Sequence, residues 1–143
     1  MIRTAEFYGL KEIYIYDSNE LMSPPSNKVT RADMNHMARV WTAGAIEFID
    51  IIKVDNPDIF VLDHHGRSIA TVVSSNARSL HSFSFQKDDL IVMGSEKEGL
   101  PEEFIGKCSH QVYIPNLGNT DCLNVSVTLG IVMNEAIRQL NVD

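Results

Sequence analysis

The chain has 143 residues, of which 44% are hydrophobic and 22% are charged, and its formal net charge is −7. This length is typical of one domain with a sizeable core. The acidic balance argues against a protein that is held to nucleic acid mainly by a strongly basic surface, although it leaves room for a local basic patch.

Targeting and metal-binding signals are missing from the sequence. No apolar run is long enough to cross a bilayer, and the N-terminus does not resemble a secretory signal. Cys108 and Cys122 lack metal-type spacing, and one possible pair is no disulfide framework. We therefore expect a reduced, cytoplasmic protein without a membrane partner or a metal.

The first residues predict a helix followed by a strand. Residues 1–8 have helical character, and Gly9 occupies the place of a residue that ends a helix. Residues 12–16 are β-branched and aromatic, which predicts a strand. Since an α/β domain usually opens with a strand, we expect the chain to begin in the middle of a unit.

Residues 17–30 are rich in turn-forming residues and predict a loop, and a helix is expected from about Arg31 to Thr42. Arg31 and Arg39 could contact phosphate, although a solvated face is the more common role for either residue. Apolar residues recur at helical spacing and predict a side that faces the core: Met34, Met37, Ala38 and Trp41.

The middle of the chain is harder to interpret. Residues 45–52 fit a strand only in part, whereas the short apolar run 59–62 predicts a buried parallel strand. Asp63, His64 and His65 follow this run, and the rim of a ligand site is a better interpretation than a metal site because the sequence places no third ligand. Residues 68–85 are weakly patterned, and their serines form no nucleophile motif.

The last third of the chain predicts a binding site. Two apolar runs, 89–93 and 111–114, each end in a polar loop that contains glycine, and a long helix is expected over 123–140 with Glu135 and Arg138 able to pair. Open α/β sheets bind ligands at the loops that follow their strands. We therefore expect the loops after these two strands to hold a ligand.

Each feature of these loops has a plainer alternative. Gly94 would let the backbone approach a flat ligand, yet the loop 94–100 taken alone is more typical of a surface turn. Asn124 could present its amide to a ligand, or it or Ser126 could cap the last helix. Cys122 could be a nucleophile, but a small buried thiol is the commoner case.

Taken together, these stretches resemble the SpoU or TrmH-like branch of the SPOUT methyltransferases. Residues 90–100 resemble the second motif of that family, and residues 113–115 with 123–127 resemble its third. Residues 3–10 resemble the end of its first motif, and residues 38–45 resemble the helix between. The resemblance spans nearly the whole chain, in order.

The resemblance implies an α/β fold, with a mostly parallel sheet, helices on both faces and a C-terminal trefoil knot. It implies a methyltransferase that uses S-adenosylmethionine, transfers a methyl group to a ribose 2′-hydroxyl of tRNA or rRNA, and works as a homodimer. The cofactor-binding positions carry over to four residues: Leu62, Gly94, Ile114 and Leu123. The catalytic positions carry over to Arg3, Glu96 and Asn124. The family's proposed base or phosphate ligand falls on Arg3, and because a guanidinium keeps its proton in proteins, the resemblance implies that Arg3 clamps phosphate or orients the hydroxyl.

The chain also departs from the family pattern. The strand and the Asn-x-Gly segment that open the first motif are missing before Met1, so we expect residues 1–143 to be one N-terminally truncated methyltransferase domain without a separate RNA-binding domain. Cys122 replaces the usual serine. Two alternatives stay open: a non-catalytic module that binds the cofactor or a nucleotide, and an unrelated small-molecule enzyme that uses a metal at His64 and His65.

Overall fold

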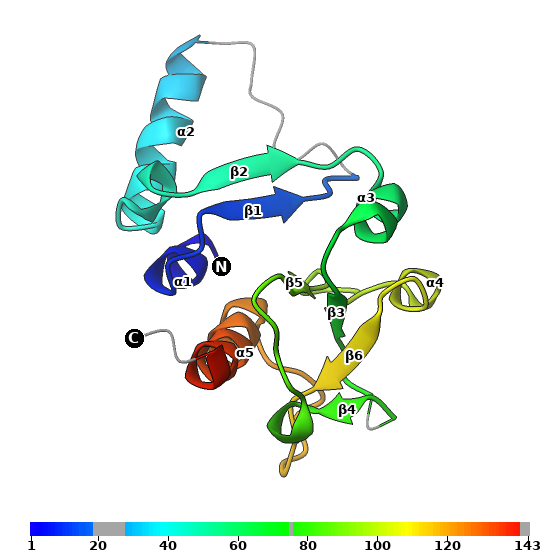
Figure 1. Cartoon of the computed structure of the whole chain (residues 1–143). Coiled ribbons are helices and arrows are strands. Elements are labelled where there is room, and N and C mark those ends of the chain that lie inside the picture. Colours follow the sequence, from blue (N-terminus) through cyan, green and yellow to red (C-terminus); the bar gives the residue numbers. More distant parts are fainter. Residues whose placement is uncertain (19–27, 75, 141–143) are drawn as a thin grey trace. The chain divides into compact units, whose positions relative to one another are not determined.

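The computed structural model describes residues 1–18, 28–74 and 76–140. The chain divides into two compact units, Met1–Pro57 and Asp58–Asp143 (Figure 1). No helix within the described ranges is long and apolar enough to span a membrane.

The first unit contains a two-stranded parallel sheet. Its elements are α1 (Ile2–Phe7), β1 (Glu12–Ile15), α2 (Lys28–Trp41), η1 (Ala45–Glu47) and β2 (Asp50–Lys53), with β1 paired to β2. The predicted first helix and strand are confirmed, and Gly9 ends α1 with a φ of 76°. The ambiguous stretch 45–52 contains both a 3-10 turn and the start of a strand.

The prediction that α2 turns an apolar side to the core is wrong. Met34, Met37 and Trp41 are 49%, 40% and 74% exposed. Spacing along the sequence correctly predicted a helix, but it carries no information on whether a neighbouring element covers the apolar side. The helix also begins at Lys28, within the predicted loop 17–30, of which residues 19–27 lie outside the described part of the chain.

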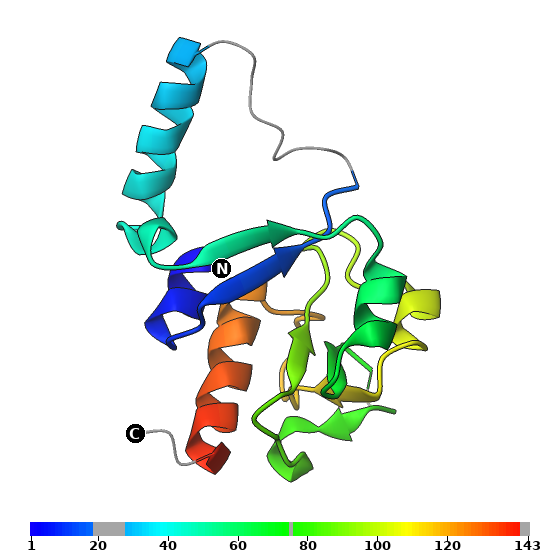
Figure 2. The ribbon, with the colours of Figure 1, turned by 45° about the horizontal axis from the view of Figure 1, so that its top comes forward.

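The second unit contains a four-stranded sheet in which every pairing is parallel. Its elements are α3 (Pro57–Asp63), β3 (Ser68–Thr71), β4 (Arg78–Ser79), η2 (Leu80–Ser82), β5 (Leu90–Val92), α4 (Glu102–Ile105), β6 (His110–Tyr113) and α5 (Val125–Leu140), and the strand order is β4-β6-β3-β5. Helix α5 covers one face of the sheet, and α3 and α4 lie on the other (Figures 1 and 2). The predictions for β5, β6 and α5 are confirmed, as are the parallel pairing and the helices on both faces.

The predicted strand over residues 59–62 is wrong, because these residues belong to α3. Pro57 at the first helical position and Asp58 in the first turn are helix-start signals. A run of four apolar residues cannot distinguish a strand from a helix. Only Val61 of this run is buried, whereas Ile59 and Leu62 are 56% and 65% exposed, as expected for a helix with one covered side.

Strand β3 lies at the centre of the unit, within the stretch 68–85 whose sequence shows little pattern. Ser68, Ile69 and Ala70 are all buried. Ser68 satisfies its polar groups through Ser109: the Ser109 amide donates to Ser68 Oγ at 2.9 Å, and the Ser68 amide donates to Ser109 Oγ at 3.2 Å. This reciprocal pair joins the starts of β3 and β6.

The core of the second unit lies between the sheet and α5. It is formed by Ile69, Leu80, Phe83, Phe85, Val112, Val132 and Ala136. On α5, Ala136 is buried against this core, whereas Val127 and Ile131 are 50% and 37% exposed.

Gln139 fastens α5 to the chain segment beside it. Its Nε2 donates to the Phe83 carbonyl, and its Oε1 accepts from the Phe85 amide, both at 2.8 Å. The predicted Glu135–Arg138 pair is confirmed at 2.7 Å. Arg138, with Gln139, lowers the pKa of Glu135 to about 2.

A bidentate ion pair joins the starts of β3 and β5. Arg67 Nε and a terminal nitrogen donate to the two carboxylate oxygens of Asp89 at 2.8 and 2.7 Å. The Asp89 side chain is only 3% exposed, and its hydrogen bonds raise the pKa of Arg67. Asp89 also accepts from the Gln86 amide at 2.8 Å, so one carboxylate orders both the strand start and the turn before it.

We expect Asp89→Ala to lower the free energy of unfolding by about 2–3 kcal/mol, because it leaves a partly buried guanidinium and an amide without their acceptor. Urea denaturation followed by circular dichroism would measure the loss. Glu47→Ala is the matched control, since it breaks the exposed Arg39–Glu47 pair and should cost at most about 0.5 kcal/mol. Equal losses in the two variants would contradict a special role for the Asp89 pair.

Candidate functional site

Three neighbouring strands end at one edge of the second unit's sheet. Since β3, β5 and β6 are adjacent and parallel, the segments that follow them lie at the same edge, where open α/β sheets bind ligands. These segments begin at Val72, Met93 and Ile114. The two loops predicted to form the site, after β5 and β6, therefore lie at the same edge of the sheet, one on either side of the central strand β3.

The loop after β5 folds tightly on itself. A Cβ atom at position 94 would lie 2.2 Å from the Gly99 carbonyl carbon and 2.4 Å from the Leu100 nitrogen, so only glycine fits there. The Gly99 amide donates to the Ser95 carbonyl at 3.0 Å, and Gly99 has a φ of 68°. The loop's own closure thus requires Gly94, whether or not a ligand approaches it.

A side-chain hydrogen bond connects this loop to the start of α5. Asn124 Nδ2 donates to Glu96 Oε1 at 3.1 Å, and Asn124 Oδ1 accepts from the Ser126 amide at 2.8 Å. Of the two predicted alternatives for Asn124, the structure confirms that it caps α5, and its side-chain amide also contacts the loop after β5. Glu96 and Asn124 are both exposed at this edge.

The residues predicted to hold the cofactor from this edge share one property. Within the described part of the chain, no hydrogen bond engages the backbone groups of Gly94, Ile114 or Leu123. Leu123 also has a side chain that is 49% exposed. Backbone donors and acceptors beside an exposed apolar side chain fit a flat, polar-edged ring such as adenine.

Leu62 does not share this position. It lies in α3, not at the end of a strand. The segment that follows the central strand is instead Val72 and Val73, which the sequence analysis missed. The Val72 amide donates to the Val112 carbonyl at 2.9 Å, and Val73 is 71% exposed, so an uncovered apolar side chain lies at the same edge.

Arg3 belongs to α1 in the first unit and is exposed. Within the described residues no carboxylate lies within 4.0 Å of its guanidinium, in contrast to Arg39, Arg67 and Arg138, which all pair with acids. An arginine without an internal acid is free to bind an external phosphate.

The remaining candidate groups are Cys122 and the histidines that follow α3. Cys122 is exposed, so the expectation of a buried thiol is wrong. His64 Nε2 lies 3.0 Å from the Asp88 carbonyl oxygen. Among the residues that the structure describes, no three His, Cys, Asp or Glu side chains are grouped to hold a metal ion.

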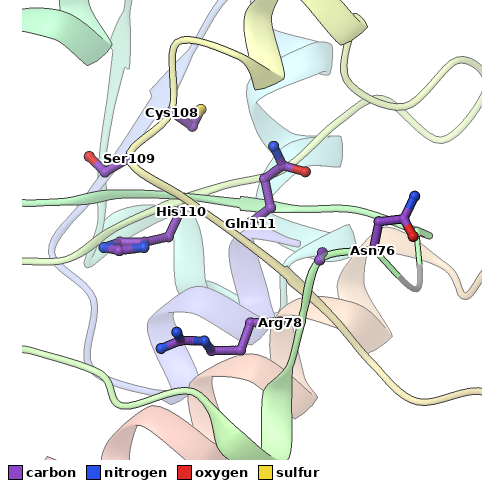
Figure 3. A pocket seen from close by; sticks show the side chains of 7 residues that line it. Asn76, Arg78, Cys108, Ser109, His110 and Gln111 are labelled. Atoms are coloured by element: carbon purple, nitrogen blue, oxygen red, sulfur yellow. The ribbon is translucent and has the colours of Figure 1, made fainter.

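A surface hollow lies at the opposite edge of the same sheet. It is lined by residues at and before the starts of β4 and β6: Asn76, Ala77, Arg78, Cys108, Ser109, His110 and Gln111 (Figure 3). None of the predicted site residues takes part in it. The hollow is therefore distinct from the site at the carboxyl ends of β3, β5 and β6.

The fold and the position of the candidate site are those of the α/β domains that bind ligands at the carboxyl edge of a parallel sheet. Residues 1–134 match the family model described as the SpoU rRNA methylase family, and the chain belongs to this family.

Relatives with assigned names support the same grouping. The chain is 27% identical over 142 residues to a tRNA (guanosine(18)-2′-O)-methyltransferase of Aquifex aeolicus, with 97% of this chain and 62% of that protein covered. It is 29% identical over 140 residues to a 23S rRNA (guanosine-2′-O-)-methyltransferase of Acinetobacter baylyi, with 96% and 53% covered. The chain thus spans a little over half the length of these relatives.

Solved structures agree in fold. The TrmH/SpoU tRNA modifying enzyme of A. aeolicus matches with a TM-score of 0.80 and 26% identity, covering 98% of this chain and 66% of that one. An AdoMet-bound rRNA methyltransferase from Sinorhizobium meliloti matches with a TM-score of 0.72 and 25% identity, covering 97% and 50%.

We expect Gly94→Ala to lower the free energy of unfolding by about 2–4 kcal/mol and to break the Glu96–Asn124 contact, because the added methyl group would overlap backbone atoms of the same loop. Chemical denaturation and amide chemical shifts of residues 95–100 would test both effects. Gly106→Ala is the control, since its Cβ would lie 3.5 Å from the nearest atom and its φ is −62°. An unshifted loop in Gly94→Ala would contradict the prediction.

Proposed function

We propose that the protein is an S-adenosylmethionine-dependent RNA methyltransferase that methylates a ribose 2′-hydroxyl of tRNA or rRNA. The observation that carries this proposal is the Glu96–Asn124 hydrogen bond, which joins the two loops beside the available backbone groups of Gly94, Ile114 and Leu123. Family membership and the names of the relatives support the same activity.

The cofactor site is proposed at the carboxyl edge of the second unit's sheet. Backbone groups of Gly94, Ile114 and Leu123 would bind the polar edge of the adenine, and the exposed side chain of Leu123 would cover its face. Leu62 stays a proposed contributor by resemblance, and Val73 joins it by position. When bound, S-adenosylmethionine would supply the methyl group on a positively charged sulfur.

The proposed catalytic residues orient the acceptor. Arg3 would bind the RNA phosphate next to the reacting ribose and hold the 2′-hydroxyl in line, which is where most of the rate enhancement of a positioned transfer originates. Glu96 offers a carboxylate oxygen toward that hydroxyl while Asn124 holds the other oxygen. The hydroxyl oxygen would take the methyl group, the C–S bond of the cofactor would break to leave a neutral thioether, and the hydroxyl proton would pass to the Glu96 carboxylate oxygen that faces it.

The larger organisation is also a proposal. We infer that residues 1–143 act as one methyltransferase domain with a C-terminal trefoil knot, as a cytoplasmic homodimer. The match of the family model over residues 1–134 supports a single functional domain. RNA would then be bound across two chains, which suits a protein with a net charge of −7.

We expect Arg3→Ala to lower methyl transfer to unmodified tRNA or rRNA at least about 100-fold, because lost positioning of the acceptor costs that much in rate. Cofactor affinity should be unchanged. Transfer of tritiated methyl groups and calorimetry with S-adenosylmethionine would measure the two quantities. Arg39→Ala, on the exposed pair with Glu47, is the control. Undiminished transfer would remove Arg3 from the site, and cofactor binding without transfer to any RNA by the unaltered protein would favour the non-catalytic module.

Asn124→Ser should separate the two roles of Asn124. Serine still caps a helix, so stability should fall by only a few tenths of a kcal/mol, but its side chain is too short to reach Glu96. Asn124→Ala should lose about 1 kcal/mol as well as the contact. Methyl transfer should fall equally in both variants. Full activity in Asn124→Ser would show that the cap alone matters.

A further inference from the structure

The hollow at the amino edge of the sheet carries a cation that the proposed catalytic site does not use. Arg78 starts β4 and is exposed, and within the described residues no carboxylate lies within 4.0 Å of its guanidinium. Among the arginines with described side chains it shares this property only with Arg3. Its charge is therefore not neutralised by a carboxylate of the described residues.

The lining of the hollow is free of acids and contains several hydrogen-bonding groups. His110, half-buried at the start of β6, packs edge-on against Phe83 with ring centroids 5.6 Å apart. The side chains of Arg78 and His110 extend to the same side of the two strands (Figure 3). Burial raises the pKa of the Cys108 thiol, so this group adds no negative charge to the hollow.

The two strands hold these groups in fixed positions. β4 pairs in parallel with β6, with Arg78 opposite Val112, whose side chain is 1% exposed, and the Ser68–Ser109 pair fastens the residue before His110. The hollow has a volume of about 290 Å³, which leaves room for a phosphate group and the water around it.

We propose that this hollow binds a backbone phosphate of the substrate RNA, at a distance from the reacting ribose. The inference rests on the proposed function. Along β6, His110 lies four residues before Ile114, and Arg78 pairs with Val112, two residues before Ile114. With a rise of ~3.3 Å per residue, these groups lie about 13 Å and about 7 Å from the carboxyl edge of the sheet, a length that a few nucleotides can cover. An unneutralised arginine beside a histidine is a phosphate-binding combination, and such contacts position an RNA strand without reading its sequence.

The test compares Arg78→Gln with Arg138→Gln, which removes the same charge from an arginine already paired with Glu135. The probe is unmodified tRNA made by transcription, with binding measured by fluorescence anisotropy over a range of salt concentrations. Arg78→Gln should weaken binding roughly tenfold and reduce the slope of log K against log[salt] by about 0.7–0.9, as expected for one lost phosphate contact. Arg138→Gln should change neither, and both variants should keep the cofactor affinity of the unaltered protein.

A second variant and a second probe keep the test decisive. Arg78→Lys should retain the salt slope, since it keeps the charge and loses only the planar fork. An unchanged slope and affinity in Arg78→Gln would overturn the inference. So would a result in which inorganic phosphate shifts the NMR signals of Arg78 and His110 while tRNA affinity stays independent of Arg78, because the hollow would then bind free phosphate.

Failure of the proposed function gives a different result. If the unaltered protein binds tRNA through Arg78 but transfers no methyl group to it, the RNA-binding inference is supported and the catalytic proposal is wrong.

Discussion

The close approach of Gly94 to Gly99 and Leu100 is the constraint on which the candidate site depends. No side chain fits between these backbone atoms, so the chain leaves β5 and returns within a few residues. The return closes through the Ser95–Gly99 bridge and places Glu96 where Asn124 can reach it. Because Gly94 has no Cβ atom, the loop after β5 can bring Glu96 within hydrogen-bond distance of Asn124 at the start of α5.

The two edges of the sheet are held in different ways. At the amino edge, the starts of β3, β5 and β6 are tied by side chains, through the Arg67–Asp89 ion pair and the Ser68–Ser109 hydrogen bonds. At the carboxyl edge, backbone groups are left without protein partners in the described part of the chain. Fixing one end of each strand by side chains leaves the other end free to bind a ligand without loosening the sheet.

The sequence predicted best the strands and the helix whose ends form the candidate site. β5, β6 and α5 are apolar runs bounded by glycine, proline or asparagine, and the same boundaries form the loops of the site. β3 was not predicted because it begins with the polar residue Ser68, whose burial depends on a partner 41 residues away. α3 and the apolar side of α2 were misjudged for a related reason: what covers a residue is decided by tertiary contacts that spacing does not encode. The hydrogen bond from Asn124 to Glu96 likewise depends on tertiary structure, so the sequence could not predict it.

An acidic protein that works on RNA must concentrate its attraction in few places. With 19 acids against 12 bases, long-range attraction to a polyanion is weak, so binding depends on cations that the fold leaves unneutralised. The fold pairs Arg39, Arg67 and Arg138 with acids and leaves Arg3 and Arg78 without one among the described residues. Pairing thus removes the guanidinium charge of these three arginines from competition for RNA phosphates. An RNA strand would then be attracted to defined points instead of to the surface as a whole, which favours one register of the strand over sliding. In the proposed function, the acidic remainder would add to specificity, because it would repel every RNA that cannot place its phosphates at those points.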